Sequence, residues 1–195
     1  MSSFVGHVAT AAAIYFRGSG RDDSARRWLL PLLTVLAVAP DFDYFALWLF
    51  GIDPQPRITH TLAFYLIVAA LPWIAAIRLR NGDLPASTFA VLVSASSSHL
   101  VLDLLVGVHP LPVFWPFVDS EISSPVGLLP SAAHVSLGNY YLWRNLFIEC
   151  GILLPVLAAT VALRRAVPVR AVLPKAAIVA PFWLACLIWS IGLQR

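Results

Sequence analysis

His99 and Asp103 lie four residues apart in an apolar segment that is long enough to cross a membrane. On an α-helix this spacing turns the two side chains by about 40° and separates them by about 6 Å along the axis, so both leave the same face. Histidine and aspartate in this arrangement are suitable ligands for zinc, manganese or iron. His109 follows six residues later and is a third candidate ligand. Because ionisable groups at membrane depth are costly, they usually face a protein interior and mark a functional site.

Two aspartates and a histidine in other segments extend this set. Asp41 and Asp43 follow Pro40, and on an unbroken helix they would point about 200° apart, so both could not face one metal. A helix break at Pro40 would allow both aspartates to face one metal. Alternatively, one aspartate would not bind the metal itself but would orient a metal-binding histidine. His60 begins another apolar segment with Arg57 beside it. An arginine in that position could hold a phosphate or a carboxylate.

His7 and Glu149 are two further ionisable residues in apolar segments. His7 lies in a short N-terminal run, and Glu149 follows Asn145 at the same four-residue spacing as the first pair. The alternative for any one of these residues is a hydrogen bond to a neighbouring helix, without a catalytic role. The predicted metal ligands are His7, Asp41, His60, His99, Asp103 and His109, and the predicted catalytic residues are Asp43, Arg57 and Glu149.

The composition is that of a membrane protein. Hydrophobic residues make up 59% of the 195 residues, charged residues only 12%, and the mean hydropathy is +0.81. These values exclude an ordinary soluble domain and predict one all-α, polytopic membrane helix bundle. The formal charge of +3 comes from basic residues that lie between the apolar segments, so we expect no nucleic-acid partner. Cys150 and Cys186 lie in apolar runs, where we expect neither a disulfide nor a cysteine metal site.

About five transmembrane helices and a short N-terminal helix are predicted. The apolar run at residues 4–16 is about 20 Å long as a helix, which is too short to span a membrane alone. The predicted spans are residues 28–50, interrupted at 39–43, and then 60–79, 85–108, 145–163 and 176–193. Residues 109–144 form a loop rich in proline and aromatic residues, which suits an extracytoplasmic lid at the level of the lipid headgroups.

The basic residues predict an orientation. If the loop at residues 17–27 is cytoplasmic, ten Lys and Arg residues face the cytoplasm and three face outside, as the positive-inside rule requires. Counting residues from the cytoplasmic ends then places most of the intramembrane ionisable groups in one layer, in the outer half of the membrane. The predicted heights are about 20 Å for Asp41, His99 and Glu149, about 26–27 Å for Asp103 and His60, and about 15 Å for His7, in a core about 30 Å thick.

Five short motifs carry a family resemblance. They are Gly6-His7, Pro40-Asp41-Phe42-Asp43, Arg57-Ile58-Thr59-His60-Thr61, His99-Leu100-Val101-Leu102-Asp103 and Trp115-Pro116-Phe117. In this order they resemble the signature of the YdjM-like membrane-bound metal-dependent hydrolases of bacteria, over about residues 7–149. Pro56 stands where that family has the first histidine of a His-Arg-Gly-x-Thr-His-Ser stretch, and Thr61 stands in place of its serine. The resemblance implies a hydrolase of the bacterial inner membrane and defines no substrate.

A second resemblance concerns only the order of the candidate ligands. Zinc-dependent phospholipases C use an N-terminal His, then Asp, His, a His-x-x-x-Asp pair, another His and a His-x-x-x-Glu pair. The matching series here is His7, Asp41 or Asp43, His60, His99 with Asp103, His109, and Asn145 with Glu149. Asn145 stands in place of the last histidine. This likeness implies metal-dependent phosphoester hydrolysis at the outer leaflet.

The sequence hypothesis is therefore a hydrolase that holds a divalent metal, with zinc expected and manganese or iron as alternatives. Its substrate would be a phosphoester or related ester of a membrane lipid or lipid-linked compound, and Asp103, near the outer face, would be the best candidate to bridge metals. A small transporter or proton-coupled carrier is a second reading, since a broken helix with buried acidic residues also describes a substrate pathway. A third is a non-catalytic membrane interaction protein, in which the polar layer only joins helices. The oligomeric state is left open.

Overall fold

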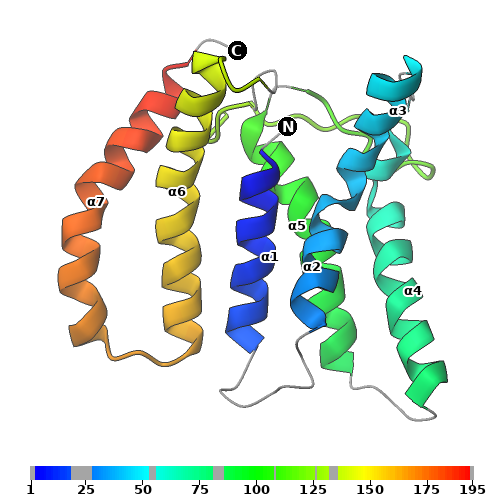
Figure 1. The fold of residues 1–195 in the computed structure, drawn as a ribbon, viewed down its shortest axis with the longest axis horizontal. Coiled ribbons are helices and arrows are strands. Elements are labelled where there is room, and N and C mark those ends of the chain that lie inside the picture. The colour runs from blue at the N-terminus through cyan, green and yellow to red at the C-terminus, as the bar shows by residue number, and fades with distance from the viewer. Residues whose placement is uncertain are drawn as a thin grey trace.

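A computed structural model of the chain describes residues 3–18, 28–52, 56–80, 86–107, 109–125, 127–131 and 136–193. Within these ranges the fold is an all-α bundle without β-strands, as predicted (Figure 1). The helices are α1 (Phe4–Gly18), α2 (Leu29–Val38), α3 (Asp43–Phe50), α4 (Leu62–Arg80), α5 (Ala86–Val106), α6 (Tyr140–Arg164) and α7 (Val169–Ile191). Two short 3-10 segments, η2 (Ala39–Phe42) and η3 (Ile58–His60), lie between them.

Four of these helices, α4 to α7, are long and apolar enough to cross a membrane. The first predicted span, residues 28–50, is divided into α2, η2 and α3. The division occurs at Pro40, which has no backbone N–H to donate to the preceding turn and so favours a break. The N-terminal helix α1 has 15 residues, fewer than the roughly 20 that a span requires. The predicted membrane helix bundle is thus confirmed, with four continuous long helices and one broken segment.

Two helices begin earlier than predicted. Helix α6 begins at Tyr140, because the Asn139 side chain caps its first turn by accepting a hydrogen bond from the backbone N–H of Tyr141 at 3.0 Å. The connection that follows α5 therefore ends at residue 139 and not at 144. Helix α7 begins at Val169, directly after Pro168, so most of the predicted basic loop at 164–175 is helical. Arginine and lysine are good helix formers, so a basic segment can be helical, as this one is.

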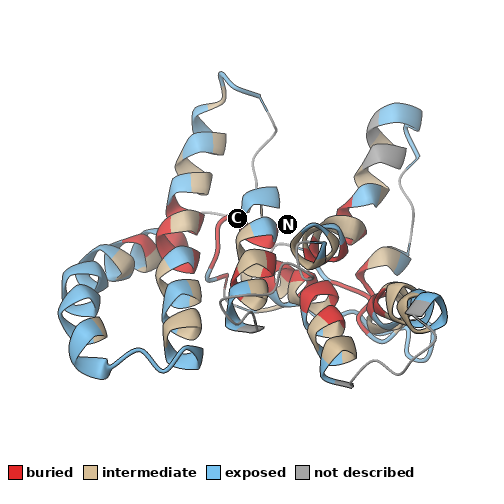
Figure 2. Cartoon of the chain, turned by 60° about the horizontal axis from the view of Figure 1, so that its bottom comes forward, coloured by how far each residue is buried: buried red, intermediate tan, exposed pale blue. Residues whose placement is uncertain are grey.

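Helix α1 occupies the middle of the bundle, where it packs against α2, α5 and α6, while α4 packs against α5 and α7 against α6 (Figure 1). Below the level of the N-terminus, small side chains let the inner helices approach closely. This core contains Ala11, Leu33, Leu36, Ala37, Ala69, Leu92 and Ala95. Figure 2 shows the buried residues gathered in the centre of the bundle and the exposed ones along α7 and at the helix ends.

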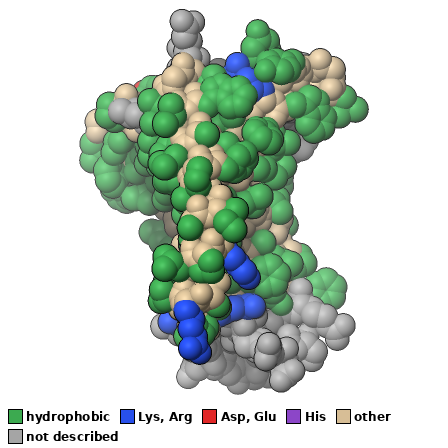
Figure 3. Space-filling view, turned by 90° about the vertical axis from the view of Figure 1, so that its left-hand side faces the viewer, with side chains coloured by type: hydrophobic (Ala, Val, Ile, Leu, Met, Phe, Trp, Pro, Cys, Tyr) green, Lys and Arg blue, Asp and Glu red, His purple; other side chains and the backbone are tan. Residues whose placement is uncertain are grey.

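The ends of the bundle differ in charge. The last turns of α1, α4 and α6 and the first turns of α2, α5 and α7 all lie at the lower end in Figure 1, whereas the start of α1, the end of α7 and the connection after α5 lie at the upper end. Figure 3 shows Lys and Arg side chains gathered at the lower end of the face formed by α7, below a hydrophobic surface, with a smaller basic patch at the upper end. This arrangement agrees with spans that cross the membrane in alternating directions, as the predicted orientation assumes. Which end faces the cytoplasm stays a prediction.

The connection after α5 folds back over the upper ends of α4 and α5. Gly107 ends α5 with a positive φ of 66°, and a Cβ atom there would lie 3.0 Å from the Ser124 carbonyl oxygen. The backbone N–H groups of Leu128 and Leu129 donate to the Leu105 carbonyl oxygen, and that of Leu62 donates to Val113. The connection is therefore tied to the same helix ends that carry the candidate site.

Candidate metal centre

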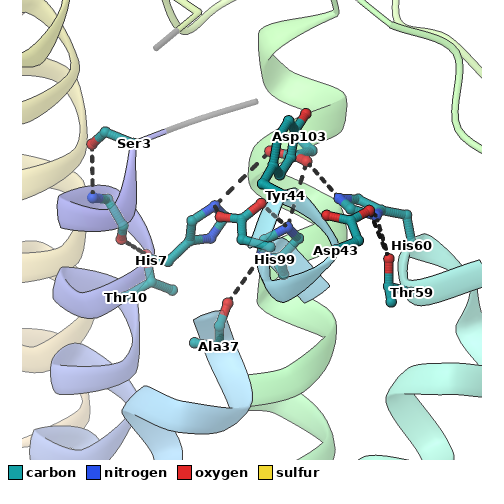
Figure 4. A network of polar contacts seen from close by, with 12 residues as sticks. Ser3, His7, Thr10, Ala37, Asp43, Tyr44, Thr59, His60, His99 and Asp103 are labelled. Atoms are coloured by element: carbon teal, nitrogen blue, oxygen red, sulfur yellow. Dashed lines mark hydrogen bonds and ion pairs between the residues drawn. The ribbon is translucent and has the colours of Figure 1, made fainter. Parts of the chain in front are cut away.

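Five of the predicted ligands converge from four separate elements. His7 comes from α1, Asp41 from η2, His60 from η3, and His99 and Asp103 from α5. The first four are 0% exposed, and Asp103 is 7% exposed. In Figure 4 the His99 ring lies between those of His7 and His60, with Asp103 above them. The His7 and His99 rings are stacked with their centroids 3.9 Å apart.

The ligand atoms of these residues form two overlapping groups, His7 with Asp41 and His99, and His60 with His99 and Asp103. His99 Nε2 is shared, since it lies 3.5 Å from both Asp41 Oδ1 and Asp103 Oδ2. His60 Nε2 also lies 3.5 Å from Asp103 Oδ2. His7 Nε2 lies 3.8 Å from Asp41 Oδ2 and 3.9 Å from Asp103 Oδ1. Asp41 thus faces two histidines and Asp103 faces three.

A backbone carbonyl sets the tautomer of His99. Its Nδ1 lies 2.8 Å from the Ala37 carbonyl oxygen at the end of α2. A carbonyl oxygen can only accept, so Nδ1 carries the proton and donates it. In the neutral imidazole Nε2 then has a lone pair, and this lone pair faces the two carboxylates. Acceptors that face one another in this way need a positive charge between them, which is either a proton on Nε2 or a metal ion.

A hydroxyl and a carboxylate set the tautomer of His60 in the same way. The Thr59 hydroxyl donates to Asp43 Oδ2 at 3.1 Å, and Thr59 Oγ1 lies 3.0 Å from His60 Nδ1. Because Thr59 gives its proton to the carboxylate, His60 Nδ1 must be the donor to Thr59. His60 Nε2 then presents its lone pair to Asp103. Asp43 Oδ2 itself lies 3.7 Å from His60 Nδ1, so Asp43 stands behind His60 while Asp41 faces His99. The break at η2 allows this division of roles.

The facing atoms fit a divalent cation. Among the described residues, both carboxylate oxygens of Asp41 and the Nε2 atoms of His60 and His99 have no hydrogen-bond partner, although all are buried. Separations of 3.5–3.9 Å are too long for hydrogen bonds. Two ligand atoms about 2.05 Å from one tetrahedral zinc ion would lie about 3.4 Å apart. The two carboxylates also bring two negative charges, which burial makes costly unless a cation balances them. These residues could therefore hold a metal ion.

A comparison with protein families agrees with the predicted resemblance. A family model described as YdjM inner membrane protein matches residues 1–191. The chain belongs to this family. The matched residues include every helix described above and all the residues that converge at the candidate centre. Comparison with curated proteins and with solved structures gives no match. The family description and the four long apolar helices together support a membrane protein.

In this YdjM family member, Arg57 lies beside the centre and does not enter either ligand group. Its guanidinium donates to the Tyr44 hydroxyl and lies over the Tyr44 ring, 4.5 Å from the ring centroid. Tyr44 follows Asp43 at the start of α3, and Arg57 directly precedes η3. The cation is therefore held at the junction of the two short elements that carry Asp41 and His60.

Glu149 is buried away from both ligand groups. Its carboxylate oxygens accept hydrogen bonds from the Ser3 backbone N–H at 3.0 and 3.2 Å. Ser3 lies directly before α1, and its hydroxyl accepts a hydrogen bond from the Gly6 N–H at 3.2 Å. Glu149 therefore caps the N-terminus of α1 from the neighbouring helix α6. Its partner at the predicted four-residue spacing, Asn145, donates instead to the Ser131 carbonyl oxygen.

His109 also belongs to neither group and lies exposed in a bend after α5. The pKa of His109 is lowered from its ordinary value, chiefly because its imidazole is partly desolvated and also because Arg57 is nearby. His109 is therefore neutral at pH 7.

Three groups that contribute to the site had no role in the sequence hypothesis, namely the Ala37 carbonyl, the Thr59 hydroxyl and the Ser3 N–H. The position of Thr59 next to His60 was a signal for the second of these, whereas backbone groups give no sequence signal.

Replacing Thr59 by valine tests the support of His60. Thr59→Val keeps the shape of the side chain and removes the hydroxyl that links His60 to Asp43. Loss of such a supporting contact weakens metal affinity by about 10–100-fold, and we expect this range in a competitive zinc titration of the purified protein. Thr160→Val is the matched control, because Thr160 donates only within α6, to the Leu157 carbonyl oxygen. Equal affinities of the two variants would contradict the role of Thr59.

Proposed function

We propose that the protein is a membrane-embedded metal-dependent hydrolase. Its substrate would be a phosphoester or related ester of a lipid or lipid-linked compound, cleaved at the outer leaflet. The observation that carries the proposal is the buried set of three imidazoles and two carboxylates, whose ring nitrogens and carboxylate oxygens face one another at 3.5–3.9 Å. The family resemblance inferred from the motifs points to the same class of reaction.

Each residue of the centre has a distinct part in this proposal. His7, Asp41, His60, His99 and Asp103 hold the metal, which we expect to be zinc, with manganese or iron as alternatives. A divalent cation held there would polarise a phosphoryl oxygen and activate a water molecule. Asp43 orients His60 through Thr59. Arg57 would bind the negative charge of the substrate, since a guanidinium suits phosphate geometry.

The position of the centre supports an extracytoplasmic reaction. It lies in the upper half of the bundle, away from the lower end where α1, α4 and α6 end and α2, α5 and α7 begin (Figure 1). By the positive-inside rule the lower, basic end faces the cytoplasm. The connection after α5, tied to the ends of α4 and α5, would cover a substrate that enters from the outer leaflet. The proposed location is the bacterial inner membrane.

A non-catalytic role for the polar layer is less well supported. Helices that are joined only by polar side chains should form hydrogen bonds between them. Here the histidines and the two facing aspartates are too far apart for this, and their other contacts aim the Nε2 atoms at the carboxylates. A transporter remains the second candidate because of the broken segment with buried Asp41. Transport into vesicles by a metal-free protein without turnover would favour it.

The direct test is metal analysis and turnover of the protein purified in detergent. We expect at least one bound divalent metal per chain, and hydrolysis of bis(p-nitrophenyl) phosphate or of phosphatidic acid in mixed micelles. A chelator should remove both the metal and the activity, and added zinc should restore them. The proposal is wrong if the purified wild type holds no metal, or if its hydrolytic activity survives complete removal of the metal.

A further inference from the structure

Tyr65 is a buried residue of the bundle. It has no role in the sequence hypothesis, and it belongs to neither ligand group. It lies in the first turns of α4, five residues after His60, and is 1% exposed. Its hydroxyl has no hydrogen-bond partner among the described residues. Buried hydroxyl groups without a partner are rare in folded proteins, and each one calls for an explanation. Phenylalanine in this position would pack equally well at no such cost.

The surroundings of Tyr65 place it at the metal centre. Its ring centroid lies 6.4 Å from that of His99, with the planes tilted by 36°. His99 Nε2 in turn lies 3.5 Å from both Asp41 Oδ1 and Asp103 Oδ2. The remaining contacts of the ring are apolar, with Leu100, Leu111 and Val113 in the same buried cluster. Tyr65 therefore packs between this apolar cluster and the ring of a histidine of the centre.

We propose that Tyr65 is a substrate-binding residue whose hydroxyl donates a hydrogen bond to an anionic oxygen of the phosphoester held at the metal centre. This rests on the proposed hydrolase function. A phenol is a good donor in a site where the protein's own carboxylates are engaged with the metal. A donor that is already in place for charge that develops on the substrate stabilises the transition state without rearrangement. The substrate would then supply the hydrogen-bond acceptor that the Tyr65 hydroxyl lacks among the described residues.

Tyr65→Phe is the variant that tests this, because it removes one oxygen and keeps the ring. We expect the metal content to stay at the wild-type level and kcat to fall by about 10²–10³-fold, as for other donors to a developing oxyanion. We also expect the affinity of the metal-loaded protein for inorganic phosphate, measured by calorimetry, to fall at least about tenfold. The thermal midpoint of the metal-free variant should equal or exceed that of the wild type, since no hydrogen bond is lost.

Tyr15→Phe is the matched control. Tyr15 packs against the apolar core below the site and against Phe16, so its hydroxyl should affect neither turnover nor phosphate affinity. Three results would overturn the assignment while leaving the hydrolase function intact. These are Tyr65→Phe with the kinetics of Tyr15→Phe, loss of metal from Tyr65→Phe, which would make the residue a ligand, and a lower midpoint of the metal-free variant, which would make it structural. A wild type without metal and turnover would instead overturn the proposed function, and this assignment with it.

Discussion

His99→Ala is expected to abolish metal binding, because His99 Nε2 is the one nitrogen that belongs to both ligand groups. Loss of a contact that only supports a ligand costs about 10–100-fold in affinity, so loss of the shared ligand should weaken binding by more than about 100-fold. Hydrolysis should fall to background with the metal. His99→Gln should lose the metal and the activity as well, although its amide can still donate to the Ala37 carbonyl oxygen. This variant therefore separates loss of the metal from loss of packing.

His109→Ala is the comparison for this experiment. It removes the same side chain from an exposed bend outside both ligand groups, and we expect the metal to remain. Inductively coupled plasma mass spectrometry of the purified variants measures the outcome directly. Retention of metal by His99→Ala, or its loss from His109→Ala alone, would show that the centre is elsewhere.

Gly6→Ala is expected to destabilise the fold through the cap of α1. A Cβ atom at Gly6 would overlap Glu149 Oε1 and lie 3.1 Å from Leu153 Cδ1. The carboxylate would have to leave the Ser3 N–H, which it holds at 3.0 and 3.2 Å. Hydrogen bonds to charged groups contribute about 1.5–3 kcal/mol, so the free energy of unfolding should fall by about 2–3 kcal/mol. Because His7 is the next residue, the variant should also bind metal less tightly.

The control is Gly138→Ala, at a glycine where an added Cβ would have nothing within 4 Å. A double-mutant cycle with Glu149→Ala sharpens the test. If the methyl group acts through the carboxylate, Gly6→Ala should cost much less in the Glu149→Ala background, with a coupling energy within the range of about 0.5–3 kcal/mol. Thermal or denaturant unfolding in detergent measures each corner. Additive costs, or a Gly6→Ala variant as stable as Gly138→Ala, would contradict the capping role of Glu149.

Some of the site follows from local geometry and was therefore predictable. His99 and Asp103 share a helix face because the α-helical repeat alone brings residues four apart together, and both indeed face His60 and each other. The break after α2 follows from proline chemistry. The all-α membrane fold follows from the length and hydropathy of the segments, because a bilayer requires backbone hydrogen bonds to be satisfied within each helix.

Other parts depend on which helices are neighbours, which residue spacing does not define. Counting residues gives approximate heights in the membrane, and it places the predicted catalytic residue Glu149 in the same layer as the metal ligands because height carries no information on lateral position. In the fold, α6 lies on the far side of α1 from α2 and α5, so Glu149 meets Ser3. Packing of small residues such as Ala11, Ala37 and Ala95 sets these distances, and it does so through contacts between distant parts of the chain.

The sequence by itself therefore determined the class of fold, the family motifs and the same-face pair on α5. Only the tertiary structure decided that His7, on a helix too short to cross the membrane, completes the centre, that Asp41 faces His99 while Asp43 stands behind His60, and that His109 lies apart. The physical reason is that helical periodicity is a local property of a few residues, whereas a metal centre built from four elements depends on how separate helices pack. Its tautomers are set by a backbone carbonyl and a hydroxyl, groups that become partners only after packing is complete.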